Sequence, residues 1–284
     1  MLNFISWDMD PAIFSIGSLE IRYYGLMWAS SFWLGYILLK KIYIKEGVKE
    51  TLMDPLLYAS LIGAVVGARL GHVLFYDFDW YFTSNNSAHE SHVLSVLNIR
   101  EGGLASHGGA IGGILGIAWY VKYKIDKSFL WVIDRAVIVG ALIGLFIRIG
   151  NFFNSEIIGV ETQKPWGVIF KQKIMIWSQD EDKIVYEDFA RHPAQLYEAA
   201  AYGIVLILLL FLYRKKSFIN QEGKMLGFFF VTVFTARYFI EFVKNSQHGI
   251  ESLIGSVLTT GQLLSVPFVL IGVWLMVRKS KQPL

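Results

Sequence analysis

Long apolar stretches alternate with short polar ones along the whole chain. Four runs contain no Asp, Glu, Lys or Arg: 23–39, 102–121, 199–213 and 252–277. A helix needs roughly 20 predominantly apolar residues to cross a bilayer, and these runs come close to that length or exceed it. The pattern predicts seven helices, at about 18–39, 53–76, 103–121, 129–149, 194–213, 225–243 and 257–277. We therefore expect an all-α integral membrane protein with seven transmembrane helices.

Composition also favours a membrane protein. The 284-residue chain is 54% hydrophobic and only 17% charged, and its mean hydropathy is +0.46, which is more apolar than a soluble domain usually is. The chain contains no cysteine, so any thiol chemistry must use a thiol of the substrate. Asp8 and Asp10 occupy the place of the basic stretch that begins a cleavable signal peptide, so we expect no removable segment before the first helix.

Positive charges gather in alternate loops. Lys and Arg residues are frequent at 40–49, 122–127 and 214–224, and again in the C-terminal tail. The positive-inside rule then places these loops and the C-terminus in the cytoplasm and the N-terminus on the periplasmic side. The polar stretch at about 150–193, between helices four and five, falls outside and is long enough for a small periplasmic head. We expect a single transmembrane domain over residues 1–284, with this head as an insertion.

Small residues recur at every fourth position in the second and third predicted helices. The positions are Gly63, Gly67 and Gly71 in one helix and Gly108, Gly112 and Gly116 in the other. Such spacing lets the backbones of two helices approach closely in lipid. Packing alone accounts for these glycines.

Several charged residues fall inside predicted spans, although a charge at the bilayer centre costs roughly 2.5 to 3.5 kcal/mol on insertion scales. Because alternate helices run in opposite directions, most of these residues share the outer half of the membrane. Arg237, for example, lies about 20 Å along its helix from Lys224 and about 10 Å from Lys244. The set comprises Arg69, Asp134, Arg135, Arg148, Glu198, Arg237 and Glu241.

Arginines at one depth suit a phosphate that carries a fatty tail, because a fixed guanidinium binds phosphate in a bidentate fork. The alternative is that each arginine pairs with a carboxylate for structural reasons. Arg237 and Glu241 have the i,i+4 spacing for such a pair, and Asp134 lies next to Arg135.

Histidines offer two further candidates for chemistry. His107 stands among small residues in GGLASHGGAIGG (102–113), where the glycines leave room for a headgroup and an imidazole can act as a general base at neutral pH. A hydrogen bond between helices is the alternative for this side chain. His89 and His92 share a polar loop, but a metal site needs further ligands, so we expect a solvated loop and no metal.

The stretch GLFIRIGNFFNSEIIG (144–159) closely resembles the signature of the prolipoprotein diacylglyceryl transferase family, in which Arg, Gly-Asn-Phe, Asn, Glu and Gly recur at this spacing. Ile147 and Ser155 depart from it, since glycine is common at both positions. The resemblance covers most of the chain and is weakest at 160–190. Five further motifs follow the family's order: IRYYGLMW (21–28), GARLGHVLFYD (67–77), GGLASHGG (102–109), RHPAQLYEA (191–199) and ARYFIEFVK (236–244).

This resemblance implies a multi-pass enzyme of the bacterial inner membrane. Such an enzyme transfers the diacylglyceryl group of phosphatidylglycerol to the lipobox cysteine of a prolipoprotein and releases glycerol phosphate. The implied partners are phosphatidylglycerol, the prolipoprotein signal peptide and membrane lipid, without nucleic acid, metal or organic cofactor.

The reaction alkylates sulfur, so the enzyme must stabilise a leaving phosphate and help to deprotonate a thiol. Our hypothesis assigns Arg148 and Arg237 to the phosphate and His107 to the role of base. The residues expected to bind phosphatidylglycerol, or to orient the arginines, are Tyr24, Arg148, Asn151, Glu156, Gly159 and Glu241.

A transporter or receptor-like binding protein would also have seven spans and polar residues within its bundle. Secondary transporters commonly show inverted repeats and a site near the midplane. Here no repeat is visible, and the polar residues are biased towards the outer side. The six ordered motifs favour the enzyme.

Overall fold

The computed structural model describes residues 4–17, 19–78, 82, 96, 103, 105–170, 175–178, 183–186, 189–245 and 258–278. Its contacts divide the chain into two compact units. Unit 1 combines Met1–Leu39 with Ile133–Leu284, and unit 2 is Lys40–Val132.

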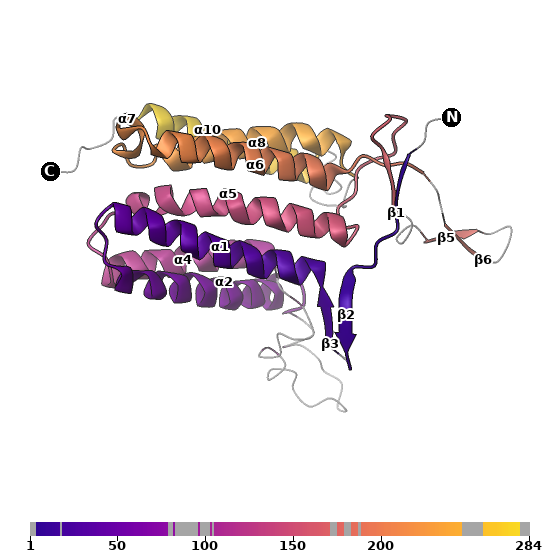
Figure 1. The fold of residues 1–284 in the computed structure, drawn as a ribbon, viewed down its shortest axis with the longest axis horizontal. Coiled ribbons are helices and arrows are strands. Elements are labelled where there is room, and N and C mark those ends of the chain that lie inside the picture. Colours follow the sequence, from indigo (N-terminus) through magenta and orange to yellow (C-terminus); the bar gives the residue numbers. More distant parts are fainter. Residues whose placement is uncertain are drawn as a thin grey trace. The chain divides into compact units, whose positions relative to one another are not determined.

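Seven helices of 17 or more residues make up most of the described chain (Figure 1). Each overlaps one of the helices predicted from the pattern. Five helical segments are long and apolar enough to cross a membrane, and α1 and α4 are not among them. The chain is therefore a mostly helical, multi-pass membrane protein. The helices are α1 (Tyr23–Lys45), α2 (Met53–Phe75), α4 (Ser106–Tyr123), α5 (Phe129–Phe153), α6 (Ala194–Tyr213), α8 (Lys224–Ile240) and α10 (Thr260–Val277).

Short elements connect these helices. The helical ones are η1 (Glu50–Leu52), α7 (Lys216–Ile219) and η4 (Glu241–Val243). Six described strands form three two-stranded sheets: β1 (Ile5–Trp7) runs parallel to β4 (Val168–Phe170), while β2 (Ala12–Ile16) with β3 (Leu19–Arg22) and β5 (Met175–Ser178) with β6 (Lys183–Tyr186) are antiparallel.

The first helix differs from its prediction at both ends. It begins at Tyr23, not at 18, because β2 and β3 form a hairpin that turns at Gly17, whose φ is +61°. In β3, Leu19 and Ile21 alternate with Glu20 and Arg22, as expected of a strand, so they do not line a helix face. The helix ends at Lys45, not at 39, because lysine is a good helix former and its long stem can lie along apolar surface.

In unit 2 the glycines join α2 to α4, as predicted. A Cβ added to Gly67 would lie 2.8 Å from the Cα of Gly112, and one added to Gly71 would lie 2.9 Å from the Cα of Gly108. Gly63 meets the carbonyl of Gly112 in the same way. No larger residue fits at these crossings without moving a backbone, which is how small residues hold two helices together in lipid.

In unit 1 a buried carboxylate ties α5 to the start of α8. Asp134 is fully buried, and its two oxygens accept hydrogen bonds from the backbone N–H groups of Gly223 (2.6 Å) and Leu226 (2.9 Å). It therefore caps a neighbouring helix, which satisfies N–H groups that have no partner within that helix. Asp134, one of the charged residues within a predicted span, therefore has a structural role.

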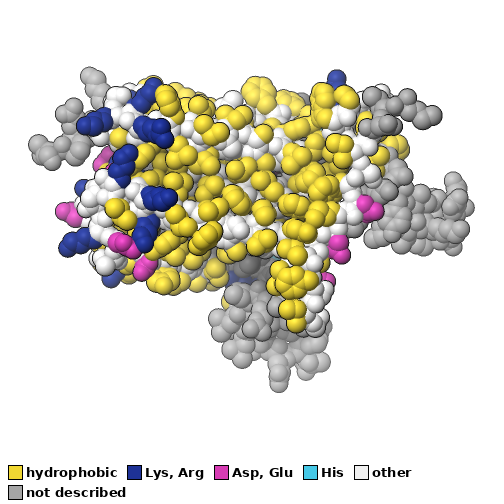
Figure 2. All heavy atoms as spheres, viewed as in Figure 1, with side chains coloured by type: hydrophobic (Ala, Val, Ile, Leu, Met, Phe, Trp, Pro, Cys, Tyr) yellow, Lys and Arg dark blue, Asp and Glu magenta, His cyan; other side chains and the backbone are white. Residues whose placement is uncertain are grey.

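The outer faces of the helices are apolar. Trp33, Ile62, Ile207 and Leu270 are each more than 60% exposed. Figure 2 shows hydrophobic side chains over the helices on the visible face, with Lys and Arg gathered where helices end. An apolar exterior of this kind fits a lipid environment.

The stretch at about 150–193, where a head was expected, contains strands and pairs with the N-terminal segment of the chain. α5 runs to Phe153, four residues beyond its predicted end, and β4 pairs with β1 from the beginning of the chain. Trp7 packs against Phe152 with ring centroids 4.4 Å apart, and Phe170 meets Phe152 edge-on at 5.8 Å. The stretch 150–170 is thus held partly by the N-terminal segment, which the helical pattern did not predict.

Candidate active site

The C-terminal end of α5 carries the signature and packs closely against the start of α1. A Cβ added to Gly150 would lie 2.9 Å from the Tyr24 ring, so glycine is what allows the two helices to approach here. The Tyr24 hydroxyl is within electrostatic range of both Arg148 and Glu156. Three residues predicted for the site from sequence therefore lie together: Tyr24, Arg148 and Glu156.

Glu156 is surrounded by amide side chains. Asn151 Nδ2 donates to one carboxylate oxygen at 3.3 Å, and Asn154 Nδ2 donates to the other at 3.1 Å. Gln195 Nε2 reaches the backbone carbonyl of Glu156 at 2.5 Å. All three amides are buried, with exposed fractions of 5%, 8% and 0%. Asn151 was predicted for the site, whereas Asn154 and Gln195 were not, although both stand in the recognised motifs.

The backbone on either side of Glu156 is strained. Ser155 has a φ of 51° and Ile157 a φ of 57°, a region that costs a residue with a side chain about 1 to 2 kcal/mol. This conformation explains why glycine is common in the family where Ser155 stands here. Nothing in the structure explains Ile147.

Gly159 lies in an extended segment between two other segments of the chain, around His192 and Val243. Its N–H donates to the carbonyl of His192 (2.9 Å), and the next N–H, of Val160, donates to the carbonyl of Val243 (2.9 Å). A Cβ on Gly159 would lie 2.5 Å from the Val243 oxygen and 2.6 Å from both Cβ and O of His192. The structure therefore places Gly159, one of the residues expected at the site, in a ladder where only glycine fits.

A chain of buried charges, in which neighbouring side chains form ion pairs, connects α5, α6 and the residues that follow α8. Arg148 Nη1 lies 3.1 Å from one oxygen of Glu198, and Lys244 Nζ lies 3.6 Å from the other. Lys244 also contacts Glu241, at 3.1 Å. These side chains are 5% to 15% exposed, so each charge depends on its partner. Lys244 was not predicted as a site residue; its i,i+3 spacing from Glu241 was the available signal.

Arg237 stands apart from this chain of charges. The pair with Glu241, the structural alternative for Arg237, is not formed. The Glu241 carboxylate instead contacts Lys244 and the start of α10, where a Cβ on Gly261 would lie 2.6 Å from Glu241 Oε1. Among the described residues, no carboxylate lies within ion-pair distance of Arg237. A half-buried guanidinium without a carboxylate is suited to a bound anion.

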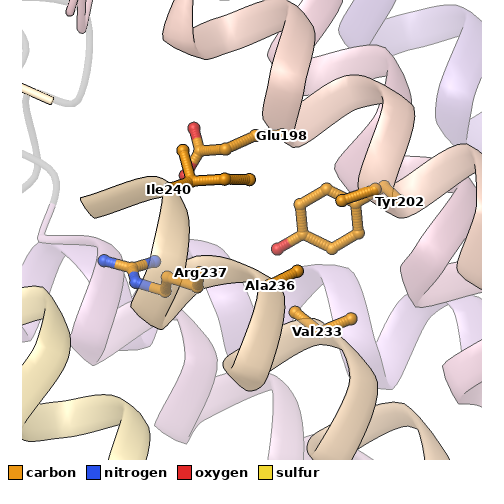
Figure 3. A pocket seen from close by; sticks show the side chains of 7 residues that line it. Glu198, Tyr202, Val233, Ala236, Arg237 and Ile240 are labelled. Atoms are coloured by element: carbon orange, nitrogen blue, oxygen red, sulfur yellow. The ribbon is translucent and has the colours of Figure 1, made fainter. Parts of the chain in front are cut away.

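Arg148 and Arg237 both lie beside Glu198 and Tyr202 of α6. Arg237 lines a pocket with Glu198 and Tyr202 (Figure 3), and Arg148 pairs with that same Glu198. Arg148 and Arg237 are both within electrostatic range of the Tyr202 hydroxyl. The cavity volume is about 10 Å³, room for roughly one water molecule, so a headgroup enters only if the lining side chains move. Val233, Ala236 and Ile240 of α8 supply the apolar wall.

Three histidines singled out in the sequence remain. His107 is exposed in the first turn of α4, in unit 2. His89 and His92 fall outside the described residues. Across the described part of the chain, no group of three or more His, Asp and Glu side chains could hold a metal ion.

A second polar cluster, formed by Trp166, His192 and Tyr197, lies at the start of α6. The Tyr197 hydroxyl accepts a hydrogen bond from Trp166 Nε1 at 2.8 Å and lies 2.9 Å from His192 Nδ1. Partial burial, together with the charge of Lys164, lowers the pKa of His192 from its ordinary value. The neutral imidazole is therefore favoured at this position.

Known proteins resemble the chain along nearly its whole length. Residues 11–278 match the family model described as prolipoprotein diacylglyceryl transferase. A phosphatidylglycerol–prolipoprotein diacylglyceryl transferase of Tolumonas auensis is 42% identical over 276 residues, which cover 97% of this chain and 98% of the relative. Proteins of the same name from Chloroherpeton thalassium and Porphyromonas gingivalis are 36% and 40% identical, and each alignment covers 99% of this chain and 96% of the relative. The chain belongs to the prolipoprotein diacylglyceryl transferase family.

Proposed function

We propose that this protein transfers the diacylglyceryl group of phosphatidylglycerol to the lipobox cysteine of prolipoproteins, which forms a thioether and releases glycerol phosphate. This reaction is the first step of bacterial lipoprotein maturation. The relatives' names support the substrates. The structural observation that carries the proposal is Arg237, a guanidinium without a carboxylate partner among the described residues, close to the signature residue Arg148.

The proposed setting is the bacterial inner membrane. All seven long helices would span it, with the N-terminus in the periplasm and the C-terminus in the cytoplasm. Residues 1–284 would act as one domain whose head, at about 150–193, stands on the periplasmic side. The basic loops support this orientation, and the five most apolar helices support repeated crossing.

In the proposed reaction the substrate thiol first gives its proton to His107. The thiolate attacks the glyceryl carbon that carries the phosphate ester, a C–S bond forms, and the C–O bond breaks. The electron pair leaves with glycerol phosphate. A thiol has an ordinary pKa near 8.5, so a nearby base or positive field need lower it only modestly.

Arg148 and Arg237 would stabilise the charge that grows on the leaving phosphate. Fixed donors in a water-poor site act strongly on such a charge, and removal of one typically costs about 100- to 1,000-fold in rate. Glu198 and Lys244 would hold Arg148 in place, since their charges alternate along one buried chain.

The headgroup would lie against the residues that surround these arginines. The Glu156 carboxylate, fixed by Asn151, is suited to accept hydrogen bonds from the glycerol hydroxyls of the lipid. Tyr24 would close the site from α1. Gly159 and Glu241 would act through the backbone ladder and through Lys244.

The test is transfer by the protein in lipid vesicles that contain phosphatidylglycerol labelled in its acyl chains. A lipobox peptide should gain the label, and a matched peptide with serine in place of the cysteine should not. Arg148→Gln and Arg237→Gln should each abolish most of the transfer. Arg22→Gln is the matched control, because Arg22 is exposed and pairs only with Glu20 among the described residues. Unlabelled peptide together with solute flux across the vesicles would instead support a transporter.

A further inference from the structure

Arg69 is a buried charge in unit 2 that the proposed reaction does not use directly. It lies near the C-terminal end of α2 and is only 7% exposed. Its Nε donates to the backbone carbonyl of Val96 at 2.8 Å, and its Nη1 donates to that of Gly103 at 3.2 Å. One guanidinium therefore binds main-chain oxygens that are 27 and 34 residues further along the chain.

His72, one helical turn after Arg69, contacts the same segment. Gly103 has a φ of +71°, and a Cβ there would lie 2.6 Å from the His72 ring and 2.7 Å from Arg69 Nη1. Asp77 holds the ring through Nε2 at 2.8 Å. Gly103 thus packs closely against the side chains of Arg69 and His72, with a positive φ that residues other than glycine rarely adopt.

The segment after Gly103 is fixed as well. The N–H of Ala105 donates to the carbonyl of Ala68 at 2.9 Å, and Ala105 is 8% exposed. Two residues later comes His107, exposed in the first turn of α4. The next residue, Gly108, packs against the α2 backbone at Gly71. His107 therefore lies between Ala105 and Gly108, both of which contact the backbone of α2.

Resting on the proposed function, we propose that Arg69 is a positioning residue for the transfer reaction. By binding the carbonyls of Val96 and Gly103 it holds the entry to α4, and this fixes the direction in which His107 meets the substrate thiol. Two of the N–H groups of this guanidinium already bind main-chain carbonyls, so we assign Arg69 a role through His107. A base displaced by about 1 Å can lose about 100-fold in rate.

The kinetic test is a double-mutant cycle between Arg69→Gln and His107→Asn. We expect Arg69→Gln to lower kcat about 10- to 100-fold, with KM for phosphatidylglycerol within about 3-fold of the wild type. The double variant should be no slower than His107→Asn alone, because a positioning residue has no effect once the group it positions is gone. Multiplicative losses, a raised KM with unchanged kcat, or wild-type activity of Arg69→Gln would each overturn the proposal.

Thiol labelling tests the anchoring role of Arg69 without depending on the proposed transfer reaction. The chain has no cysteine, so Ala105→Cys places a single thiol at a buried point of the held segment. We expect its labelling by a water-soluble maleimide to rise about tenfold or more when Arg69→Gln is added, and less with the milder Arg69→Lys. Arg22→Gln is the control and should leave labelling unchanged. Unchanged labelling in both Arg69 variants refutes the anchoring role, whereas a fully active His107→Asn refutes the base and leaves the labelling result standing.

Discussion

Replacement of Gly159 by alanine probes the backbone ladder that joins the signature segment to the residues just before α6 and just after α8. The added methyl group would lie 2.5 Å from the Val243 oxygen and 2.6 Å from two atoms of His192. Two of these three atoms are backbone oxygens, so no side chain can rotate away to relieve the overlap. The ladder itself must widen.

The expected cost follows from this overlap. Insertion of a methyl group into a filled site typically costs about 1 to 3 kcal/mol. A change of 1 kcal/mol shifts the unfolding midpoint of a chain of this size by roughly 2 to 4 °C. Gly159→Ala should therefore lower the midpoint by about 2 to 12 °C. Transfer activity should fall as well, because Lys244 follows Val243 directly and belongs to the buried chain of charges.

The matched control is Gly140→Ala in the interior of α5. The nearest atom to a Cβ there is Phe229 Cζ, at 4.0 Å, which is an ordinary contact. Alanine should stabilise this helical position by about 0.5 to 1 kcal/mol. The assay is thermal unfolding in detergent, followed by tryptophan fluorescence, with transfer activity measured on the same samples. If Gly159→Ala unfolds at or above the wild-type midpoint, the close contact at Gly159 is wrong.

Three further predictions concern stability. Asp134→Ala should lower the free energy of unfolding by about 1 to 3 kcal/mol in denaturant titration, because it leaves the buried N–H of Gly223 and the partly buried N–H of Leu226 without their acceptor. Ser155→Gly should raise the free energy of unfolding by about 0.5 to 1 kcal/mol by relieving a φ of 51°; a loss of stability would contradict the left-handed conformation. Burial lowers the pKa of His192 below its ordinary 6.5, so between the two pKa values the unfolded chain binds more protons than the folded one. The contribution of His192 to stability should therefore be constant above about pH 6.5 and be lost as the pH drops through the lowered pKa. His192→Gln should remove this contribution from unfolding curves measured from pH 5 to 8, and an unchanged slope would contradict it.

The helices could be predicted because their signal is local. Each long helix coincides with an apolar run, and the glycines of α2 and α4 meet as their four-residue spacing indicated. The hairpin before Tyr23 was missed because a short apolar segment next to a longer one reads as an extension of the helix. The strand at Ile5–Trp7 was missed for another reason, since its partner is more than 160 residues away.

The residue types of the candidate site follow from the sequence motifs, but the pairing of their charges does not. Arg148, Asn151 and Glu156 follow from the signature, and the structure places them together in unit 1. Which carboxylate neutralises which cation depends on contacts between distant helices. The i,i+4 spacing allowed Glu241 to pair with Arg237, but in the structure Glu241 forms an ion pair with Lys244. That choice leaves Arg237 available for an anion.

The most direct test of the central claim is a single-turnover measurement with an excess of protein over lipobox peptide. The account predicts that thioether and glycerol phosphate appear at the same rate in the wild type, and that Arg237→Gln slows both by about 100-fold or more. A variant that still forms thioether within about 3-fold of the wild-type rate would contradict a role for Arg237 in stabilising the leaving phosphate.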